Sequence, residues 1–214
     1  AILLLINCIS TVYGEESNKD LIVSIEPGSN WTQTMKILFF PIKMGPQIAA
    51  WIETLDGGYV STITVTKSAS NQKWKGNPEG GRPESLPVWT FAKNASEVDE
   101  VTSATPEKGV QTGISAYNLV PGKQYRVLIE VNSSYDFNDR WPKTAKEGDA
   151  SFSGVNGQPS IIYEAVFTAE KEGTVSLIPV GKGSIDGSNG EIERNLDGIT
   201  NALSIIKSAT ITVK

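Results

Sequence analysis

Residues 99–105 read Asp-Glu-Val-Thr-Ser-Ala-Thr and place three hydroxyl side chains, Thr102, Ser103 and Thr105, close together behind an acid. Serine and threonine hydroxyls are the usual acceptors of phosphoester bonds in proteins, and the small Ala104 leaves the approach to Thr105 open. The same residues suit a plain turn, because the carboxylate of Asp99 can accept hydrogen bonds from nearby backbone N–H groups. The segment is therefore either a turn or a place where a group is attached.

Composition excludes most other reactive arrangements. The chain contains no histidine, and its one cysteine is Cys8. Histidine-dependent nucleophiles and zinc sites built from His and Cys are therefore excluded within this chain, and no disulfide can form within it. A pair of carboxylates acting as acid and base needs a cleft and a fixed separation, and no pattern in the sequence marks one. We therefore expect no catalytic site.

The charges give no sign of a polyanionic partner. The formal net charge is −5, with acidic and basic residues interspersed. Phosphate backbones require a clustered positive surface, and anionic lipids attract a basic patch. We expect no nucleic-acid partner, and membrane contact only through other proteins or a retained N-terminus.

The N-terminus indicates export. Ala1–Ile9 is an apolar run that is shorter than the roughly 20 residues needed to span a bilayer, and small or tolerated residues precede a cleavage point after Gly14. This predicts a signal peptide over 1–14 and one periplasmic or extracellular domain over 15–214. The alternatives are lipidation of Cys8 and retention of the segment as an anchor or docking strand.

The remainder of the chain alternates short β-rich runs with turns. Asp56-Gly57 lies between two such runs, which is a strong hairpin signal. Apolar residues alternate over 124–131, where Tyr125 is expected at a corner or in the core. The pattern predicts an all-β, immunoglobulin- or fibronectin-III-like sandwich of about nine to eleven strands with at most one short C-terminal helix, within 199–206. The apolar or β-rich runs are 21–25, 34–40, 47–54, 59–66, 88–91, 124–131, 160–168, 174–180 and 209–213, and 68–87 is expected to be a polar loop.

Three other features have a site interpretation beside a structural one. Residues 136–139 offer oxygen ligands for calcium, but a solvated loop is favoured. Residues 186–191 look like a calcium loop whose glycine is out of place, and we interpret them as a turn. Tryptophans on an exposed face can hold sugar rings, yet in a sandwich they more often pack in the core or at an edge. The tryptophans are Trp31, Trp51, Trp74, Trp89 and Trp141.

Several phrases in a fixed order carry a family resemblance. They are Ile48–Glu53, Gly58–Val60, Leu86–Trp89, Asp99–Pro106, Gly122–Val127, Asn156–Tyr163 and Gly198–Leu203. Over roughly residues 35–214 the chain resembles the predicted periplasmic proteins of domain-of-unknown-function family 2271. Lys182 departs from the family's pattern, which leads us to expect His there. The resemblance implies a compartment and a setting near membrane redox proteins and FAD:protein FMN transferases.

That setting implies a chemistry for the opening segment. Substrates of this transferase carry the pattern Asp-x-x-Ser/Thr-Gly-Ala-Ser/Thr, whose last hydroxyl is esterified to FMN. Asp99, Thr102, Ala104 and Thr105 match it, and Ser103 stands where glycine is usual. The resemblance implies covalent FMN on Thr105 of a non-catalytic accessory protein, with the transferase and membrane redox proteins as partners. The alternative is an extracellular binding or structural module: carbohydrate binding, an adhesin or a filament subunit.

Overall fold

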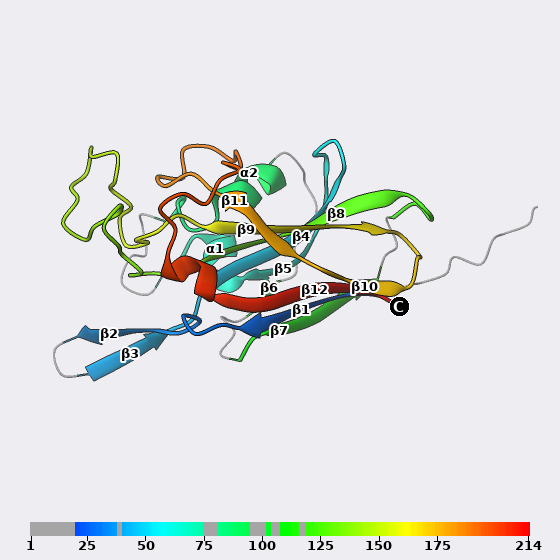
Figure 1. Cartoon of the computed structure of the whole chain (residues 1–214), viewed down its shortest axis with the longest axis horizontal. Helices are drawn as coiled ribbons and strands as arrows, with labels where there is room; N and C mark the ends of the chain where they lie inside the picture. Colours follow the sequence, from blue (N-terminus) through cyan, green and yellow to red (C-terminus); the bar gives the residue numbers. More distant parts are fainter. Residues whose placement is uncertain (1–19, 38–39, 75–80, 95–101, 104–107, 116–118) are drawn as a thin grey trace, which may run out of the picture.

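Two β-sheets packed face to face form the body of the molecule (Figure 1). The computed structural model describes residues 20–37, 40–74, 81–94, 102–103, 108–115 and 119–214. The smaller sheet has the order β10-β12-β1-β7 and the larger one the order β11-β9-β8-β4-β5-β6. All strand pairs are antiparallel except β5 with β6. This confirms the prediction of an all-β sandwich.

The strands have the following bounds. The smaller sheet contains β1 (Asp20–Pro27), β7 (Val110–Ser115), β10 (Gly173–Ser176) and β12 (Ile206–Val213). The larger sheet contains β4 (Gln47–Thr54), β5 (Tyr59–Thr66), β6 (Thr102–Ser103), β8 (Gln124–Asn132), β9 (Ile161–Thr168) and β11 (Ile178–Lys182). A separate hairpin of β2 (Gln33–Ile37) and β3 (Phe40–Met44) projects from the body (Figure 1). The run predicted over 34–40 is therefore divided between two strands.

Alternating side chains from both sheets fill the space between them. Successive residues of a strand face opposite sides of a sheet, so Leu21 and Val23 of β1 meet Val127 and Ile129 of β8 in one buried cluster. Tyr125 is also buried, and its hydroxyl accepts a hydrogen bond from the backbone N–H of Val120 at 2.9 Å. This confirms the predicted core position of Tyr125. Its hydrogen bond to Val120 connects the start of β8 to the turn before it.

The larger sheet is buried on its outer face as well. Ala49, Trp51, Leu128 and Ile162 form a second cluster there. Two helices, α1 (Lys67–Asn71) and α2 (Pro87–Asn94), cover this cluster. Burial on both faces explains why β4 has five consecutive apolar residues, Ile48–Ile52, since a strand with one wet face alternates.

Neither helix was expected from the sequence. α1 lies at the start of the stretch expected to be a polar loop, and α2 covers the short apolar run over 88–91. The four residues 88–91 are too few to show a helical period. Pro87 is the first residue of α2, a position at which its missing N–H costs nothing. The N–H groups of the next two residues, Val88 and Trp89, bind the carboxylate of Glu130, which lies outside the helix. The expectation of at most one helix is thus too low, whereas the C-terminal turn predicted within 199–206 is confirmed as the 3-10 helix η1 (Asn201–Ser204).

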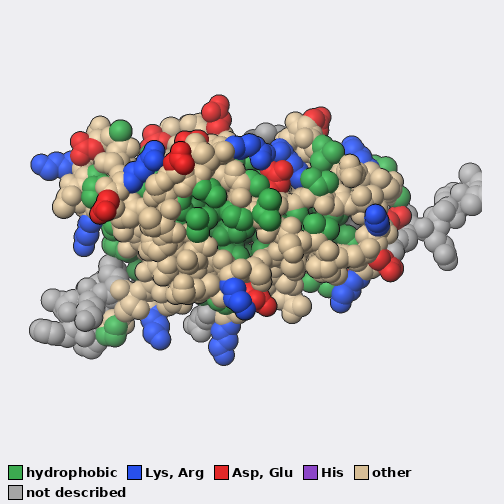
Figure 2. All heavy atoms as spheres, viewed as in Figure 1, with side chains coloured by type: hydrophobic (Ala, Val, Ile, Leu, Met, Phe, Trp, Pro, Cys, Tyr) green, Lys and Arg blue, Asp and Glu red, His purple; other side chains and the backbone are tan. Residues whose placement is uncertain are grey.

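The stretch over 173–182 serves both sheets. β10 pairs with β12 in the smaller sheet, and β11 pairs with β9 in the larger one. Between them the N–H of Leu177 donates to the carbonyl of Ala209 at 2.9 Å. Apolar side chains are grouped on the face that this stretch crosses (Figure 2), and Val166, Val175 and Ile178 are 42 %, 38 % and 62 % exposed. The single strand predicted over 174–180 is therefore two strands in different sheets.

Candidate functional site

The segment with the hydroxyl cluster reaches the described structure at the edge of the larger sheet. Thr102 and Ser103 form β6, in which they pair in parallel with Val65 and Thr66 of β5. Within the described residues β6 pairs with no other strand. The structure thus places the backbone of two predicted site residues, whereas Asp99, Ala104 and Thr105 lie outside the described residues.

The chain is fixed again directly after this segment. Gly109 has φ +98°, and a Cβ on it would lie 2.6 Å from the carbonyl oxygen of Ile25 and 3.0 Å from Cδ of Pro27. Both the positive φ and the close approach require glycine. β7 then pairs with β1 in the smaller sheet. Residues 104–107 therefore connect β6, at one edge of the larger sheet, to β7, at an edge of the smaller sheet.

A pocket of about 590 Å³ lies by the opposite edge of the larger sheet. It is lined by two stretches of chain, which we call its walls: Arg140, Trp141, Ala150 and Ser151 in one, and residues between 182 and 193 in the other. Pro159 also lines it. Five strand spacings separate β11 from β6 in this sheet, which at about 4.8 Å each is roughly 24 Å. The pocket and the hydroxyl segment are therefore separate sites.

A buried lysine forms part of the pocket. The side chain of Lys182 is 3 % exposed, and its Nζ donates to Oδ1 of Asn195 at 2.5 Å and pairs with Oε1 of Glu193 at 3.1 Å. The backbones of Lys182 and Glu193 also exchange two hydrogen bonds, at 3.0 and 2.9 Å. The ammonium charge is thus neutralised and fixed, and it is not available as an isolated cation.

The facing wall is held by stacking and hydrogen bonds. The guanidinium of Arg140 lies 5.1 Å from the ring centre of Trp141, a cation–π distance. Its NH1 donates to the carbonyl of Asp197 at 3.1 Å. Oδ1 of Asn138 accepts hydrogen bonds from the backbone N–H groups of Arg140 and Trp141, each at 3.0 Å. This wall is therefore pre-formed.

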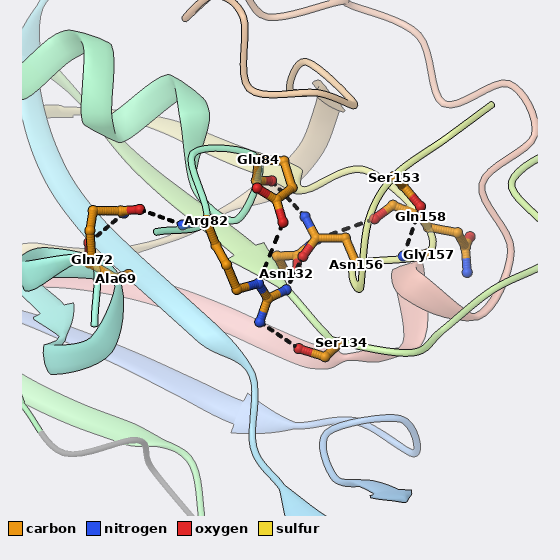
Figure 3. Close-up of polar contacts among 10 residues, drawn as sticks. All are labelled: Ala69, Gln72, Arg82, Glu84, Asn132, Ser134, Ser153, Asn156, Gly157 and Gln158. Atoms are coloured by element: carbon orange, nitrogen blue, oxygen red, sulfur yellow. Dashed lines mark hydrogen bonds and ion pairs between the residues drawn. The ribbon is translucent and has the colours of Figure 1, made fainter. Parts of the chain in front are cut away.

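A buried polar network is centred on Arg82 and Asn156 (Figure 3). The guanidinium of Arg82 donates to Oδ1 of Asn156 and to the hydroxyl of Ser134 at 2.9 Å, and it pairs with Glu84 at 3.5 Å. The amide of Asn156 donates in turn to the carbonyl of Glu84 at 2.7 Å. Burial lowers the pKa of Arg82. The network joins residues far apart in the sequence and holds the loop through Asn156.

A buried acid caps the N-terminus of α2. Glu130 of β8 is fully buried, and its carboxylate accepts hydrogen bonds from the N–H groups of Val88 and Trp89, at 3.2 and 2.8 Å, and from the hydroxyl of Ser160 at 2.6 Å. A carboxylate at a helix N-terminus satisfies N–H groups that lack partners in the helix. Burial nevertheless raises the pKa of Glu130 to about 7.

The other candidate motifs have structural roles. Asp136 is buried, and Oδ1 accepts the N–H of Gln158 at 3.0 Å. The expectation of a solvated loop is thus wrong at this residue, and burial raises its pKa to about 7. No group of three or more His, Cys, Asp or Glu residues suited to a metal occurs among the described residues.

The two remaining motifs behave as the sequence indicated. Asp186 accepts a hydrogen bond from the N–H of Ser188 at 3.0 Å, which confirms the turn predicted for that stretch. The prediction that the tryptophans pack in the core or at its edge is confirmed, because four are buried and Trp74 is half-buried and packs against the outer cluster. The buried ones are Trp31, Trp51, Trp89 and Trp141.

Comparison with known proteins gives no match among protein-family models, curated proteins or solved structures. No helix of the described part is both long enough and apolar enough to span a bilayer.

Sequence reasoning missed the pocket. Its walls come from residues that are widely separated along the chain, and no spacing rule joins Trp141 to Glu191. A partial signal was Lys182, the last residue of β11 (Ile178–Lys182). The structure buries this lysine, and a buried lysine requires a partner, because an unpaired buried charge is costly.

Proposed function

We propose that this protein is an exported, non-catalytic β-sandwich module that carries FMN covalently on Thr105 and serves as an accessory electron carrier of a membrane-linked redox system. The observation that carries the proposal is the position of β6 at the edge of the larger sheet. The matching segment 99–105 includes the last strand of the larger sheet, and Thr105 follows that strand by two residues.

An edge position suits an acceptor of a modifying enzyme. A hydroxyl that becomes esterified must enter the active site of the transferase, and central strands cannot do so because both neighbours hold them by hydrogen bonds. The described residues on either side of 104–107 are held by β5 and, at Gly109, by the backbone of β1. A group attached between these two points stays near the sandwich edge.

The proposed attachment is a phosphoryl transfer. The hydroxyl oxygen of Thr105 attacks the phosphorus of the FMN half of FAD, and the bond from that phosphorus to the AMP oxygen breaks. AMP leaves with the bonding electrons, and the hydroxyl proton passes to a base of the transferase. The chain supplies the hydroxyl alone. The attached flavin then supplies the electron chemistry, and the protein holds it in place.

The test is the intact mass of the protein after co-expression with an FAD:protein FMN transferase. The account predicts a gain of one FMN that is absent in Thr105→Val. Ser103→Ala is the matched control, because it removes a neighbouring hydroxyl and keeps the proposed acceptor. An unchanged mass of the wild-type chain, or a gain that persists in Thr105→Val, contradicts the proposal. A thermal melt of each variant shows whether it folds.

A further inference from the structure

The pocket beside Lys182 has the dimensions of a small-molecule site. Its volume of about 590 Å³ falls inside the range of roughly 300–1,000 Å³ that is typical of ligand pockets. It lies at the end of β11, about the width of the sheet away from β6. The hydroxyl segment therefore gives no reason for this pocket to exist.

Both walls of the pocket are fixed before any ligand arrives. The amide of Asn138 donates to the carbonyl of Gly198 at 2.9 Å, while its oxygen holds the N–H of Arg140 and that of Trp141. Lys182 holds the opposite wall through the backbone of Glu193. A pre-formed site spends little of its binding free energy on ordering.

The charged side chains of the pocket balance one another. Lys182 and Glu193 neutralise each other at 3.1 Å. Arg140 and Glu191 remain, one positive and one negative. The walls therefore carry no net charge, and a phosphate or a polyanion would find only one cation.

The polar groups that remain can bind hydroxyls. Within the described part of the chain, no hydrogen bond or ion pair engages the Ser151 hydroxyl or the Glu191 carboxylate. The amide nitrogen of Asn189 makes only a 3.4 Å contact, to Ser188. A carboxylate, an amide and a hydroxyl together supply both acceptors and donors. Pro159 and Ile192 add apolar surface beside them.

We propose that this pocket binds a small, neutral, polyhydroxylated ligand, a mono- or disaccharide. Such a ligand presents several hydroxyls, each both donor and acceptor, around an apolar ring face, and it carries no charge to be matched. Glu191 and Asn189 bind ring hydroxyls, Ser151 binds from the facing wall, and Ile192 packs against the C–H face. This binding is independent of any flavin on Thr105.

The test is saturation-transfer NMR followed by titration, with the whole chain and defined probes. The neutral probes are glucose, galactose, N-acetylglucosamine, maltose and cellobiose, and the charged probes are galacturonate and inorganic phosphate. The proposal predicts saturable binding of at least one neutral sugar. Ala150→Trp, which fills the pocket from an exposed position, should abolish it. Glu191→Ala should weaken it by about ten-fold, the loss of one charge-assisted hydrogen bond.

Glu147→Ala is the matched control, because Glu147 is an exposed acid on the same loop as Ala150 and should leave the affinity unchanged. Thermal melts of the variants must match the wild type, and otherwise Ser151→Ala replaces the failing variant. The proposal is overturned if no neutral sugar binds at millimolar concentration, if a charged probe binds more tightly, or if Ala150→Trp keeps the affinity.

Discussion

Glu130 makes the stability of this protein depend on pH in a direction opposite to that of most carboxylates. The perturbation is Glu130→Gln, which keeps the shape and removes the charge. The carboxylate is fully buried with no cation beside it in the described structure, and its partners are two helix N–H groups and one hydroxyl. Burial raises its pKa from 4.5 to about 7 in spite of these hydrogen bonds.

The sign of the effect follows from proton binding. The folded state holds the Glu130 proton more tightly than the unfolded state, so its contribution to stability is complete below pH 4.5 and is lost as the pH rises through 7. The rise of the pKa from 4.5 to about 7 corresponds to roughly 3 kcal/mol in total. Between pH 5 and pH 8 the expected loss in the free energy of unfolding is about 2 to 3 kcal/mol.

The assay is urea unfolding of the wild type and Glu130→Gln at pH 5 and pH 8. Between the two pH values the wild type should lose about 2 to 3 kcal/mol more of its free energy of unfolding than the variant loses. The comparison uses the change in the free energy of unfolding between the two pH values. It therefore removes the pH-independent loss of stability caused by placing an amide where a carboxylate accepted two N–H groups. Glu147→Gln, an exposed acid, controls for the change in net charge. Parallel pH profiles for wild type and Glu130→Gln would refute the reasoning.

Three further predictions concern Asp136, Trp89 and Gly109. Asp136→Asn should also flatten the pH profile of urea unfolding between pH 5 and 8, because burial raises the pKa of Asp136 to about 7, and an unchanged profile would contradict this. Trp89→Ala should reduce the free energy of unfolding by about 3–5 kcal/mol, because the ring is buried and its Nε1 donates to Thr62 at 2.9 Å; a loss below 1 kcal/mol in denaturant melts would show that the helix contributes little. Gly109→Ala should lower stability by at least about 1 kcal/mol, because of its positive φ and its contact with Ile25, and a neutral thermal melt would argue against the fixed end of the segment.

The strands were predictable where one physical signal dominates. The bounds of β4 and β5 follow from a turn at Asp56-Gly57 between two β-rich runs, and both strands begin and end where the sequence indicated. β8 was predictable because Tyr125, Val127 and Ile129 alternate toward one core. The 3-10 turn near Ala202 was visible as a short helical period.

Tertiary partners determine the features that the sequence did not show. α2 begins at Pro87 because Glu130, more than forty residues away, caps it, and no local pattern contains that information. β10 and β11 belong to different sheets because Leu177 hydrogen-bonds to β12. The pocket likewise depends on the approach of Arg140 to the loop after Lys182. The hydroxyl segment was found from its residue types alone, and the structure adds that Thr102 and Ser103 lie at a sheet edge.

The most direct test of the central claim is the mass of one tryptic peptide from natively expressed protein. Cleavage after Lys93 and Lys108 releases residues 94–108, which include the whole hydroxyl cluster. The account predicts that this peptide carries one FMN and that fragmentation places it on Thr105. An unmodified peptide from cells that contain an active FMN transferase, or FMN on Thr102 or Ser103 in place of Thr105, would contradict the account.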